Sequence, residues 1–286
     1  MHNNSIAIIP KLYILIPVFN ENDNIAKLLG NLLKFRVHIK KDLDVRVVFV
    51  DDGSDDQTVI RIEQECKALP ITILRHDKND GPGAAFGTGF EYLRNVLDKG
   101  DWVVTMEGDN TSRLSTLQQM LIRRFEGYNV VLASPYTYGG GFSHTPWHRV
   151  FLSHAANGSI KFFLGIRGIN TFSSFFRLYD FAVLDRLYEC YGSRIIEQKG
   201  FESMLELLCK MIYQKAKISE VPLEVDTSLR AGKSKMKILR TMRGYFCVIL
   251  KAKTWRRISC EEYKSKTEMM VGDESLQRSL GDEKCD

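Results

Sequence analysis

Two pairs of acidic residues are the part of this sequence best suited to chemistry. Asp51 and Asp52 directly follow one short apolar run, and Glu107 and Asp109 follow another. Continuous runs of β-branched and apolar residues are typical of parallel strands buried on both faces. Open α/β sheets bind ligands where their parallel strands end, so we expect both acidic pairs at one ligand-binding edge.

The spacing of the second pair indicates a metal site. Glu107 and Asp109 are separated only by Gly108, and hard carboxylate oxygens at this spacing suit Mg²⁺ or Mn²⁺. Such a cation is commonly shared between protein carboxylates and a diphosphate. Both pairs also have a simpler interpretation, because Asp, Asn and Gly form solvated turns and helix caps.

The pattern along the chain predicts the elements that would position these residues. Apolar runs alternate with segments of helical periodicity up to about residue 134. This β-α-β order predicts an α/β fold with a mostly parallel, nucleotide-binding sheet flanked by helices. We expect strands at 12–19, 45–50, 71–74, 102–106 and 129–134, and helices at 24–35, 58–68 and 116–125.

A glycine-rich loop, DKNDGPGAAFGTGF at residues 77–90, opens a further helix rich in small residues. Its spacing does not match the G-x-G-x-x-G pattern that follows the first strand of dinucleotide-binding proteins, which argues against a dehydrogenase. Small residues here would let the helix pack closely beside a ligand, although Pro82 also fits a plain helix start.

Length and composition set the limits of the fold. The chain has 286 residues, of which 44% are hydrophobic, enough for one large α/β domain or one domain with a helical appendage. Its six cysteines are scattered, with no C-x-x-C pair and no secretory leader, so we expect free thiols in the cytoplasm. The apolar stretches are shorter than the ~18 residues that a membrane span requires.

The C-terminal part of the chain combines positive charge with a helical apolar pattern. No Asp or Glu occurs from Thr227 to Cys260, a segment rich in Lys and Arg. Between residues 235 and 252 apolar residues recur at helical spacing, with Lys237, Arg240 and Arg243 on the other side. This predicts an amphipathic helix at an anionic membrane surface, or a helix that packs its apolar face on the protein. The stripe is too apolar for a nucleic-acid surface, so we expect no nucleic-acid partner.

The order of the motifs indicates a family. The sequence contains IPVFNEND, VDDGSDDQT, DGPGAAF, MEGDNT, SSFFRLYD, EVPLEV and RAGKSK, in this order and across residues 12 to about 250. In these motifs the chain resembles family 2 glycosyltransferases of the GT-A fold, most of all the dolichol-phosphate mannose synthase branch. The resemblance implies a GT-A catalytic domain at 11–229, between a stub at 1–10 and a basic amphipathic helical segment at 230–259. We expect the polar residues 260–286 to form a disordered tail.

The resemblance also implies roles for individual residues. The nucleotide would be bound by residues of the first two motifs and by the central glycine, namely Pro17, Phe19, Glu21, Val50, Asp52 and Gly108. Glu107 and Asp109 would hold the metal ion, Mg²⁺ or Mn²⁺, together with the diphosphate. Asp109 would be catalytic, along with Arg230 and Lys235, which grip the departing diphosphate.

Three positions depart from the family pattern. The acidic centre reads E-G-D where the family has a D-x-D-like sequence, so its first metal ligand, Glu107, is one methylene longer. Phe19 stands where the family has a tyrosine, and it can stack on a base without donating a hydrogen bond. An arginine expected after the fifth strand is absent from residues 133–136, so one sugar-phosphate contact is replaced or lost.

Two further segments have two interpretations each. Ser173, Ser174 and Arg177 would meet an acceptor phosphate, or Arg177 would be a structural arginine in a buried strand. Glu202 and Glu206 lie four residues apart on one face of a predicted helix, where they would act near the sugar or form a solvated stripe.

These observations predict an inverting transferase at the cytoplasmic face of a membrane. It would move a hexose from a nucleotide-diphosphate sugar, either GDP-mannose or a UDP-glucose-like donor, to a polyprenyl phosphate, dolichyl or undecaprenyl. A phosphate acceptor is already anionic and requires no base, and the sequence shows no unmistakable one. Two alternatives remain: a soluble transferase acting on a glycan hydroxyl with Glu202 or Glu206 as base, and a non-catalytic nucleotide-sugar-binding scaffold.

Overall fold

The computed structural model of the chain describes residues 9–66, 68–232 and 238–256. Most of the predicted N-terminal stub, the predicted tail at 260–286, and Lys235 and Lys237 lie outside these ranges. The strands are β1 (Lys11–Val18), β2 (Asp44–Asp51), β3 (Ile71–Arg75), β4 (Trp102–Thr105), β5 (Val130–Ser134), β6 (Gly141–Ser143), β7 (Arg177–Asp180), β8 (Ile218–Pro222) and β9 (Glu224–Asp226). The α-helices are α1 (Asn22–Ile39), α2 (Thr58–Glu65), α3 (Pro82–Arg94), α4 (Leu114–Arg123), α5 (Trp147–Leu164), α6 (Phe181–Tyr191), α7 (Ser203–Tyr213) and α8 (Ile238–Trp255).

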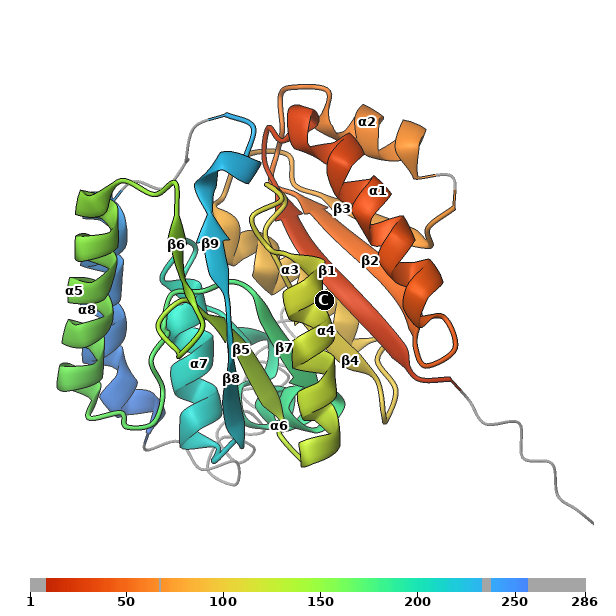
Figure 1. The fold of residues 1–286 in the computed structure, drawn as a ribbon. Helices are drawn as coiled ribbons and strands as arrows, with labels where there is room; N and C mark the ends of the chain where they lie inside the picture. Colours follow the sequence, from red (N-terminus) through yellow and green to blue (C-terminus); the bar gives the residue numbers. More distant parts are fainter. Residues whose placement is uncertain (1–8, 67, 233–237, 257–286) are drawn as a thin grey trace, which may run out of the picture.

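The main sheet has seven strands in the order β3-β2-β1-β4-β7-β5-β8 (Figure 1). Neighbouring strands run parallel, except that β7 is antiparallel to both β4 and β5. The register places Val18 of β1 opposite Asp51 of β2, so the first motif and the first acidic pair meet at one edge. The predicted α/β fold with a mostly parallel sheet is confirmed.

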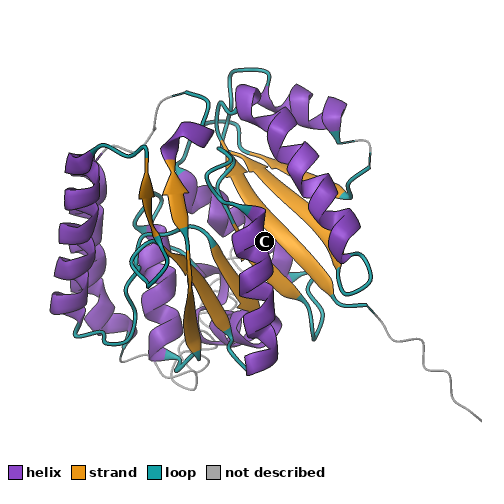
Figure 2. Cartoon of the chain, viewed as in Figure 1, coloured by secondary structure: helices purple, strands orange, loops and turns teal. Residues whose placement is uncertain are grey.

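Helices cover both faces of this sheet (Figure 2). Leu12, Ile14 and Ile16 of β1 pack in a core with residues of α1 and α4. The alternate residues Tyr13 and Leu15 pack in a second core with residues of α3, α6 and α7. Full burial of a Leu or Ile side chain contributes about 1.5–3 kcal/mol, so both cores stabilise the sheet substantially. This burial on two sides explains why the strands read as continuous apolar runs in the sequence.

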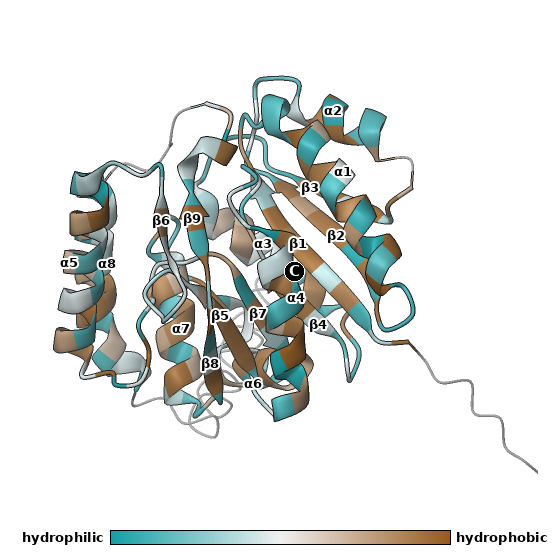
Figure 3. Ribbon diagram, in the orientation of Figure 1, coloured by the Kyte–Doolittle hydropathy of each residue, from teal (hydrophilic) through white to brown (hydrophobic). Residues whose placement is uncertain are grey.

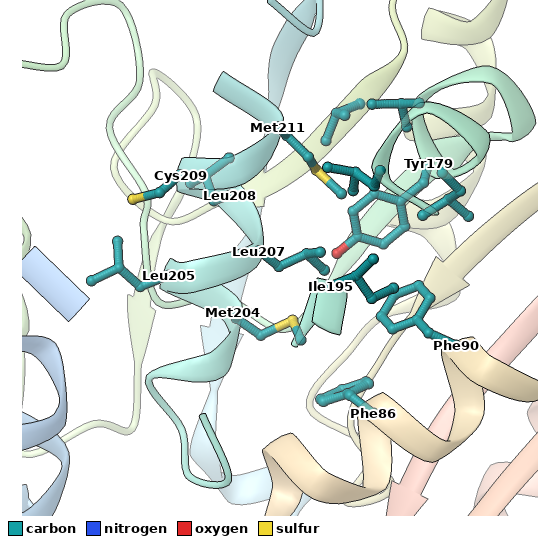
Figure 4. Close-up of a cluster of buried hydrophobic side chains, with 14 of the residues drawn as sticks. Phe86, Phe90, Tyr179, Ile195, Met204, Leu205, Leu207, Leu208, Cys209 and Met211 are labelled. Atoms are coloured by element: carbon teal, nitrogen blue, oxygen red, sulfur yellow. The ribbon is translucent and has the colours of Figure 1, made fainter. Parts of the chain in front are cut away.

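The second core holds α7 against α3 (Figure 4). Phe90 of α3 meets Tyr179 of β7 edge to face, with the ring centroids 5.9 Å apart. Leu207 and Met211 of α7 belong to the same cluster. Because α7 is fixed in this way, the loop that precedes it is held beside the start of α3.

α8 has two different apolar sides. Val248 and Trp255 are buried in the same core as α7. Met242, Phe246 and Leu250 are 49–60% exposed. The helix therefore packs on the protein through one stripe and presents a second stripe outward. The interpretation of a helix that packs its apolar face on the protein is confirmed, and the membrane-surface interpretation stays a prediction.

The described residues include four of the six cysteines and all the α-helices named above. Cys66, Cys209 and Cys247 are free thiols, as expected. Cys190 is disulfide-bonded, so the prediction of free thiols is wrong for this residue. Within residues 9–66, 68–232 and 238–256, no helix is both long and apolar enough to cross a membrane.

Candidate active site

A cavity of about 1000 Å³ opens at the carboxyl ends of β1, β2 and β4. Val50 does not line it, because its side chain is fully buried in the core on the α3 side of the sheet. Lys235 lies outside the described residues. The wall includes the other residues that the sequence predicts for the site: Pro17, Phe19, Glu21, Asp52, Glu107, Gly108, Asp109 and Arg230.

The acidic centre after β4 is a compact cluster of carboxylates and hydroxyls. Asp109 Oδ1 accepts hydrogen bonds from the backbone N–H of Thr111 at 3.0 Å and from its hydroxyl at 2.6 Å. The same hydroxyl lies 3.2 Å from Glu107 Oε2. Burial, and then repulsion by Asp109, raise the pKa of Glu107 to about 7, against the opposing effect of Arg230. A cation bound beside Glu107 would favour its ionised form.

Arg230 brings a distant part of the chain to this centre. Its guanidinium forms an ion pair with Asp109 Oδ2. The next residue, Ala231, donates its N–H to Asn24 Oδ1 at 3.0 Å and accepts from Asn24 Nδ2 at 3.2 Å. Asn24 Nδ2 also lies 2.5 Å from Glu21 Oε2. The sequence analysis did not identify Asn24 as a site residue, because it placed Asn24 at the start of a helix. The one feature of the sequence that pointed to this role is the position of Asn24 three residues after Glu21.

The acidic centre fits a divalent cation. Glu107, Asp109 and Arg230 together carry one more negative than positive charge when both carboxylates are ionised. Mg²⁺ needs only one or two protein carboxylates when substrate phosphates and water supply its other ligands. Among the described residues, no group of three or more His, Cys, Asp or Glu side chains could hold a metal by itself. The donor set therefore suits a cation that binds together with a diphosphate.

Asp52 is the centre of a hydrogen-bond cluster that holds the glycine-rich loop. Its Oδ1 accepts from the N–H of Asp80 at 3.0 Å, and its Oδ2 from the N–H of Gly81 at 2.8 Å. His76 Nδ1 lies 2.9 Å from Asp52 Oδ1, and His76 Nε2 lies 2.8 Å from the Thr88 hydroxyl. Asp52 therefore shapes the cavity wall that this loop forms, in addition to lining the cavity itself.

The glycines of the same loop permit a close backbone contact with the loop before α7. Gly81 has φ +101°, a conformation that side chains disfavour. A Cβ on Gly83 would lie 2.1 Å from the carbonyl oxygen of Gln198. The N–H of Gly83 donates to the Lys199 carbonyl at 2.8 Å. The predicted close packing is confirmed for these two glycines, and its position beside a ligand stays a prediction.

Glu206 is fully buried and structural. Its carboxylate accepts from the N–H groups of Glu197 and Gln198 at 2.9 and 2.8 Å, and lies 2.6 Å from Lys210 Nζ. Burial raises the pKa of Glu206, and Lys210 acts against this effect. The ion pair positions the loop before α7, so the prediction of Glu206 as a base is wrong. Glu202, the other candidate base, lines the cavity.

Arg177 is also structural. It is fully buried, and its guanidinium donates to the carbonyls of Ser174 (2.7 Å), Met204 (2.6 Å) and Phe172 (2.7 Å). Burial lowers its pKa. Because its Nε, Nη1 and Nη2 are all occupied, the predicted contact of Arg177 with an acceptor phosphate is wrong. Its alternative interpretation, a structural arginine in a buried strand, is confirmed.

Comparison of sequences relates the chain to enzymes of known type. Residues 13–188 match the model of glycosyl transferase family 2. The chain is 29% identical over 226 residues to polyprenol monophosphomannose synthase of Mycolicibacterium smegmatis, covering 78% of this chain and 80% of that protein. It is 27% identical over 228 residues to dolichol-phosphate mannosyltransferase of Pyrococcus furiosus, covering 79% of this chain and 59% of that protein.

Comparison of structures concerns the fold. The structure is similar to glucosyl-3-phosphoglycerate synthase from Mycobacterium tuberculosis in complex with Mn²⁺, UDP and glucosyl-3-phosphoglycerate. The TM-score is 0.58 and the sequence identity 16%, with 87% of this chain and 81% of that chain covered. At this identity the similarity establishes the shared fold.

We expect Asp52→Ala to weaken binding of a nucleoside diphosphate by about 1.5–3 kcal/mol, the range for hydrogen bonds to a charged group. The loss would come from a ligand contact and from release of the loop that Asp52 holds. Calorimetric titration with UDP and with GDP measures it. His76→Ala should cause part of the loss, and Asp77→Ala, an exposed change in the same loop, should cause none. Unchanged affinity in the Asp52 variant would remove this residue from the site.

We expect Glu206→Gln to lower the free energy of unfolding by up to about 3–5 kcal/mol, because it removes the nearer carboxylate partner of the buried Lys210 ammonium and leaves only Glu197 Oε2, 3.7 Å from Lys210 Nζ. Denaturation in urea measures the change. Glu63→Gln, at an exposed position of α2, should change stability by less than about 0.5 kcal/mol. A Glu206 variant with unchanged stability and no turnover would restore this residue as a candidate base.

Proposed function

The chain belongs to glycosyl transferase family 2, and we propose that it moves a hexose from a nucleotide-diphosphate sugar to a polyprenyl phosphate, with inversion at the anomeric carbon. It is a glycosyltransferase with a GT-A fold. The observation that carries the proposal is the cavity at the sheet edge, which gathers the acidic centre, Arg230 and the Asp52 loop around one space. The names of the two mannose-transferring relatives, one polyprenol- and one dolichol-linked, support a lipid phosphate as acceptor.

The donor is proposed to lie between the first two motifs and the acidic centre. Phe19 lines this part of the cavity and offers an aromatic ring on which a base can stack. Pro17, Glu21 and Asp52 complete the wall beside it. The donor would be GDP-mannose or a UDP-glucose-like sugar. Binding of UDP by the structural neighbour supports the placement of the nucleotide.

The chemistry is proposed to depend on charge stabilisation of the leaving diphosphate. Glu107 and Asp109 would hold Mg²⁺ or Mn²⁺, which when bound supplies positive charge to the diphosphate oxygens. Arg230, fixed by its ion pair with Asp109, presents a second positive charge to the same end of the cavity. Lys235, which follows in the same motif, is proposed to assist. Charge placed in advance where negative charge develops is usually the largest catalytic term.

The acceptor side of the cavity suits an anion. Phe175, Phe201 and Glu202 line it, together with Arg240 and Thr241 from the first turns of α8. Arg240 has no ion-pair partner among the residues that the structure describes. An oxygen of an acceptor phosphate can form its bond to the anomeric carbon while the bond to the diphosphate breaks, and no proton has to be removed.

Delivery of the acceptor is proposed to occur at the cytoplasmic face of an anionic membrane. The outward stripe of α8, Met242, Phe246 and Leu250, is flanked by the exposed residues Arg243 and Lys251. Each Lys or Arg near an anionic lipid surface contributes about 1 kcal/mol, and salt weakens this attraction. This arrangement supports reversible, peripheral association.

A second candidate function is a transferase that acts on a glycan hydroxyl. It is favoured by one observation, the position of Glu202 in the cavity wall, where a carboxylate could accept the hydroxyl proton. With Glu206 excluded by its burial, Glu202 is the remaining candidate of the two. The scaffold alternative requires that the acidic centre, with Glu107 as its longer ligand, no longer supports transfer.

We expect Asp109→Asn to lower the transfer rate by at least about 10²–10³, the cost of removing one preorganised charge-stabilising group. The substitution keeps the shape of the side chain and removes both a metal ligand and the partner of Arg230. The assay measures release of nucleoside diphosphate against Mn²⁺ concentration, with thermal unfolding as the check on folding. Full activity with an unchanged metal requirement would exclude Asp109 from the centre.

We expect the wild-type enzyme to transfer sugar to a short-chain prenyl phosphate and not to the corresponding prenyl alcohol. Arg240→Gln should raise the KM for the prenyl phosphate about tenfold or more, because a charged hydrogen bond is lost. Lys253→Gln, an exposed change on the same helix outside the cavity, should leave it unchanged. Glu202→Gln should retain transfer. Transfer to an oligosaccharide that Glu202→Gln abolishes would favour the second candidate function.

A further inference from the structure

The outer face of α5 carries large apolar side chains from its first turn to its last, and none of its exposed residues is charged. Trp147 and Phe162 are each 80% exposed, Phe151 is 64% and Phe163 66% exposed. The other exposed residues of the helix are Leu152, His148, His154, Ala155, Gly158 and Ser159, none of which is a Lys, Arg, Asp or Glu. Hydrophobic segments recur along α5 in Figure 3. Exposed apolar patches of this kind mark interaction sites in soluble proteins.

Three polar residues of α5, Ser153, Asn157 and Lys161, point the opposite way, into the protein. Asn157 donates to the hydroxyl of Tyr136 at 2.8 Å and accepts from the N–H of Phe172 at 2.9 Å. The Ser153 hydroxyl lies 2.5 Å from the same Tyr136 oxygen. Lys161 reaches the side chain of Asn170 at 3.4 Å. These bonds fix the rotation of the helix, so its aromatic face cannot turn inward.

The charge around this face is one-sided. The sequence has no Asp or Glu from Gly127 to Tyr179, a range that includes all of α5. α5 packs against α8, and the two helices lie side by side at one edge of the molecule (Figure 1). α8 belongs to the second segment without acidic residues, and it adds its own outward apolar stripe and exposed basic residues. The two helices therefore combine exposed aromatic side chains with positive charge, and neither segment contributes a carboxylate.

We propose that α5 is the principal membrane-contacting helix, and that its aromatic face inserts into the headgroup region of an anionic bilayer beside α8. Aromatic and apolar side chains combined with Lys and Arg are the composition of helices that lie in this interface. This inference rests on the proposed function in one respect: it takes the acceptor to be a lipid phosphate carried by the bilayer. α8 connects the two sites, because Arg240 and Thr241 line the cavity while later residues face outward.

A bilayer fits this surface better than a second copy of the chain. Two copies that met through it would bring basic residues of both α8 helices together without any carboxylate to pair with them. Like charges placed opposite each other at an interface oppose association. An anionic bilayer supplies the missing negative charge and accepts the aromatic side chains at the same time.

The first test is co-sedimentation of the full chain with vesicles of phosphatidylglycerol and phosphatidylcholine. Phe151→Ser and Phe162→Ser should each weaken partitioning about tenfold, because each removes one large buried apolar side chain from the bound state. Phe125→Ser removes a ring that is 78% exposed outside α5 and α8, and should leave partitioning unchanged. Thermal unfolding should show that all three variants remain folded. Equal binding of all variants would overturn the proposal.

The second test places α5 directly. Trp147 should be quenched by brominated phosphatidylcholine in the vesicles, and Trp147→Phe should remove this quenching while binding is retained. Quenching that persists in this variant would assign the contact to another tryptophan and overturn the proposal. Light scattering after size exclusion is the check on self-association. A dimer that Phe151→Ser converts to a monomer would assign the face to a second copy.

The transfer assay separates this proposal from the proposed function. With a short, soluble prenyl phosphate the α5 variants should react like the wild type, and with a vesicle-borne acceptor they should lose activity in proportion to binding. Equal activity of variants and wild type on the vesicle-borne acceptor would overturn the α5 proposal and leave the function intact. Vesicle binding through α5 without transfer to any prenyl phosphate would overturn the function and leave the docking surface.

Discussion

The ion pair between Asp109 and Arg230 is the contact on which the candidate site depends. It joins the end of the central strand β4 to a segment more than a hundred residues later in the chain. The amide of Asn24 fastens Ala231, the next residue, to the first motif. These contacts close the cavity between segments that the sheet alone would leave apart. They also hold the positive guanidinium of Arg230 beside the carboxylates of Glu107 and Asp109. Positive and negative charges are therefore already in place at this end of the cavity before any ligand binds.

Most of the fold could be predicted because its strands are buried on both faces. The apolar runs before Asp51 and Glu107 identify β2 and β4 directly, and the alternation with helices implies a parallel sheet. The direction of β7 could not be predicted. Its four residues, Arg177–Asp180, form a run too short to show periodicity, and its antiparallel pairing depends on contacts with β4 and β5. The direction of a strand is decided by the strands with which it pairs, and a four-residue sequence contains too little pattern to indicate that direction.

The lining of the cavity was predictable where a residue directly follows a strand, and less so where burial decides whether a side chain faces the cavity or the core. Asp52 and Asp109 were found because acidic residues after apolar runs are unusual. Glu206 carries the same functional group as these two residues, and Arg177 the same group as Arg230, but the structure buries Glu206 and Arg177 among backbone groups with which they form hydrogen bonds. Spacing along a helix or strand cannot distinguish a charge that faces a cavity from one that faces a core. Asn24 shows the reverse case, in which a residue assigned to a helix start organises the site.

The three carbonyls bound by Arg177 have a mechanical consequence. One rigid, planar group joins the segments that contain Phe172, Ser174 and Met204, so these segments are held together through a single side chain. Displacing any of them would remove a hydrogen bond of a buried guanidinium, which costs about 1.5–3 kcal/mol. The segment that carries Phe175, which lines the cavity, is therefore held in a fixed position.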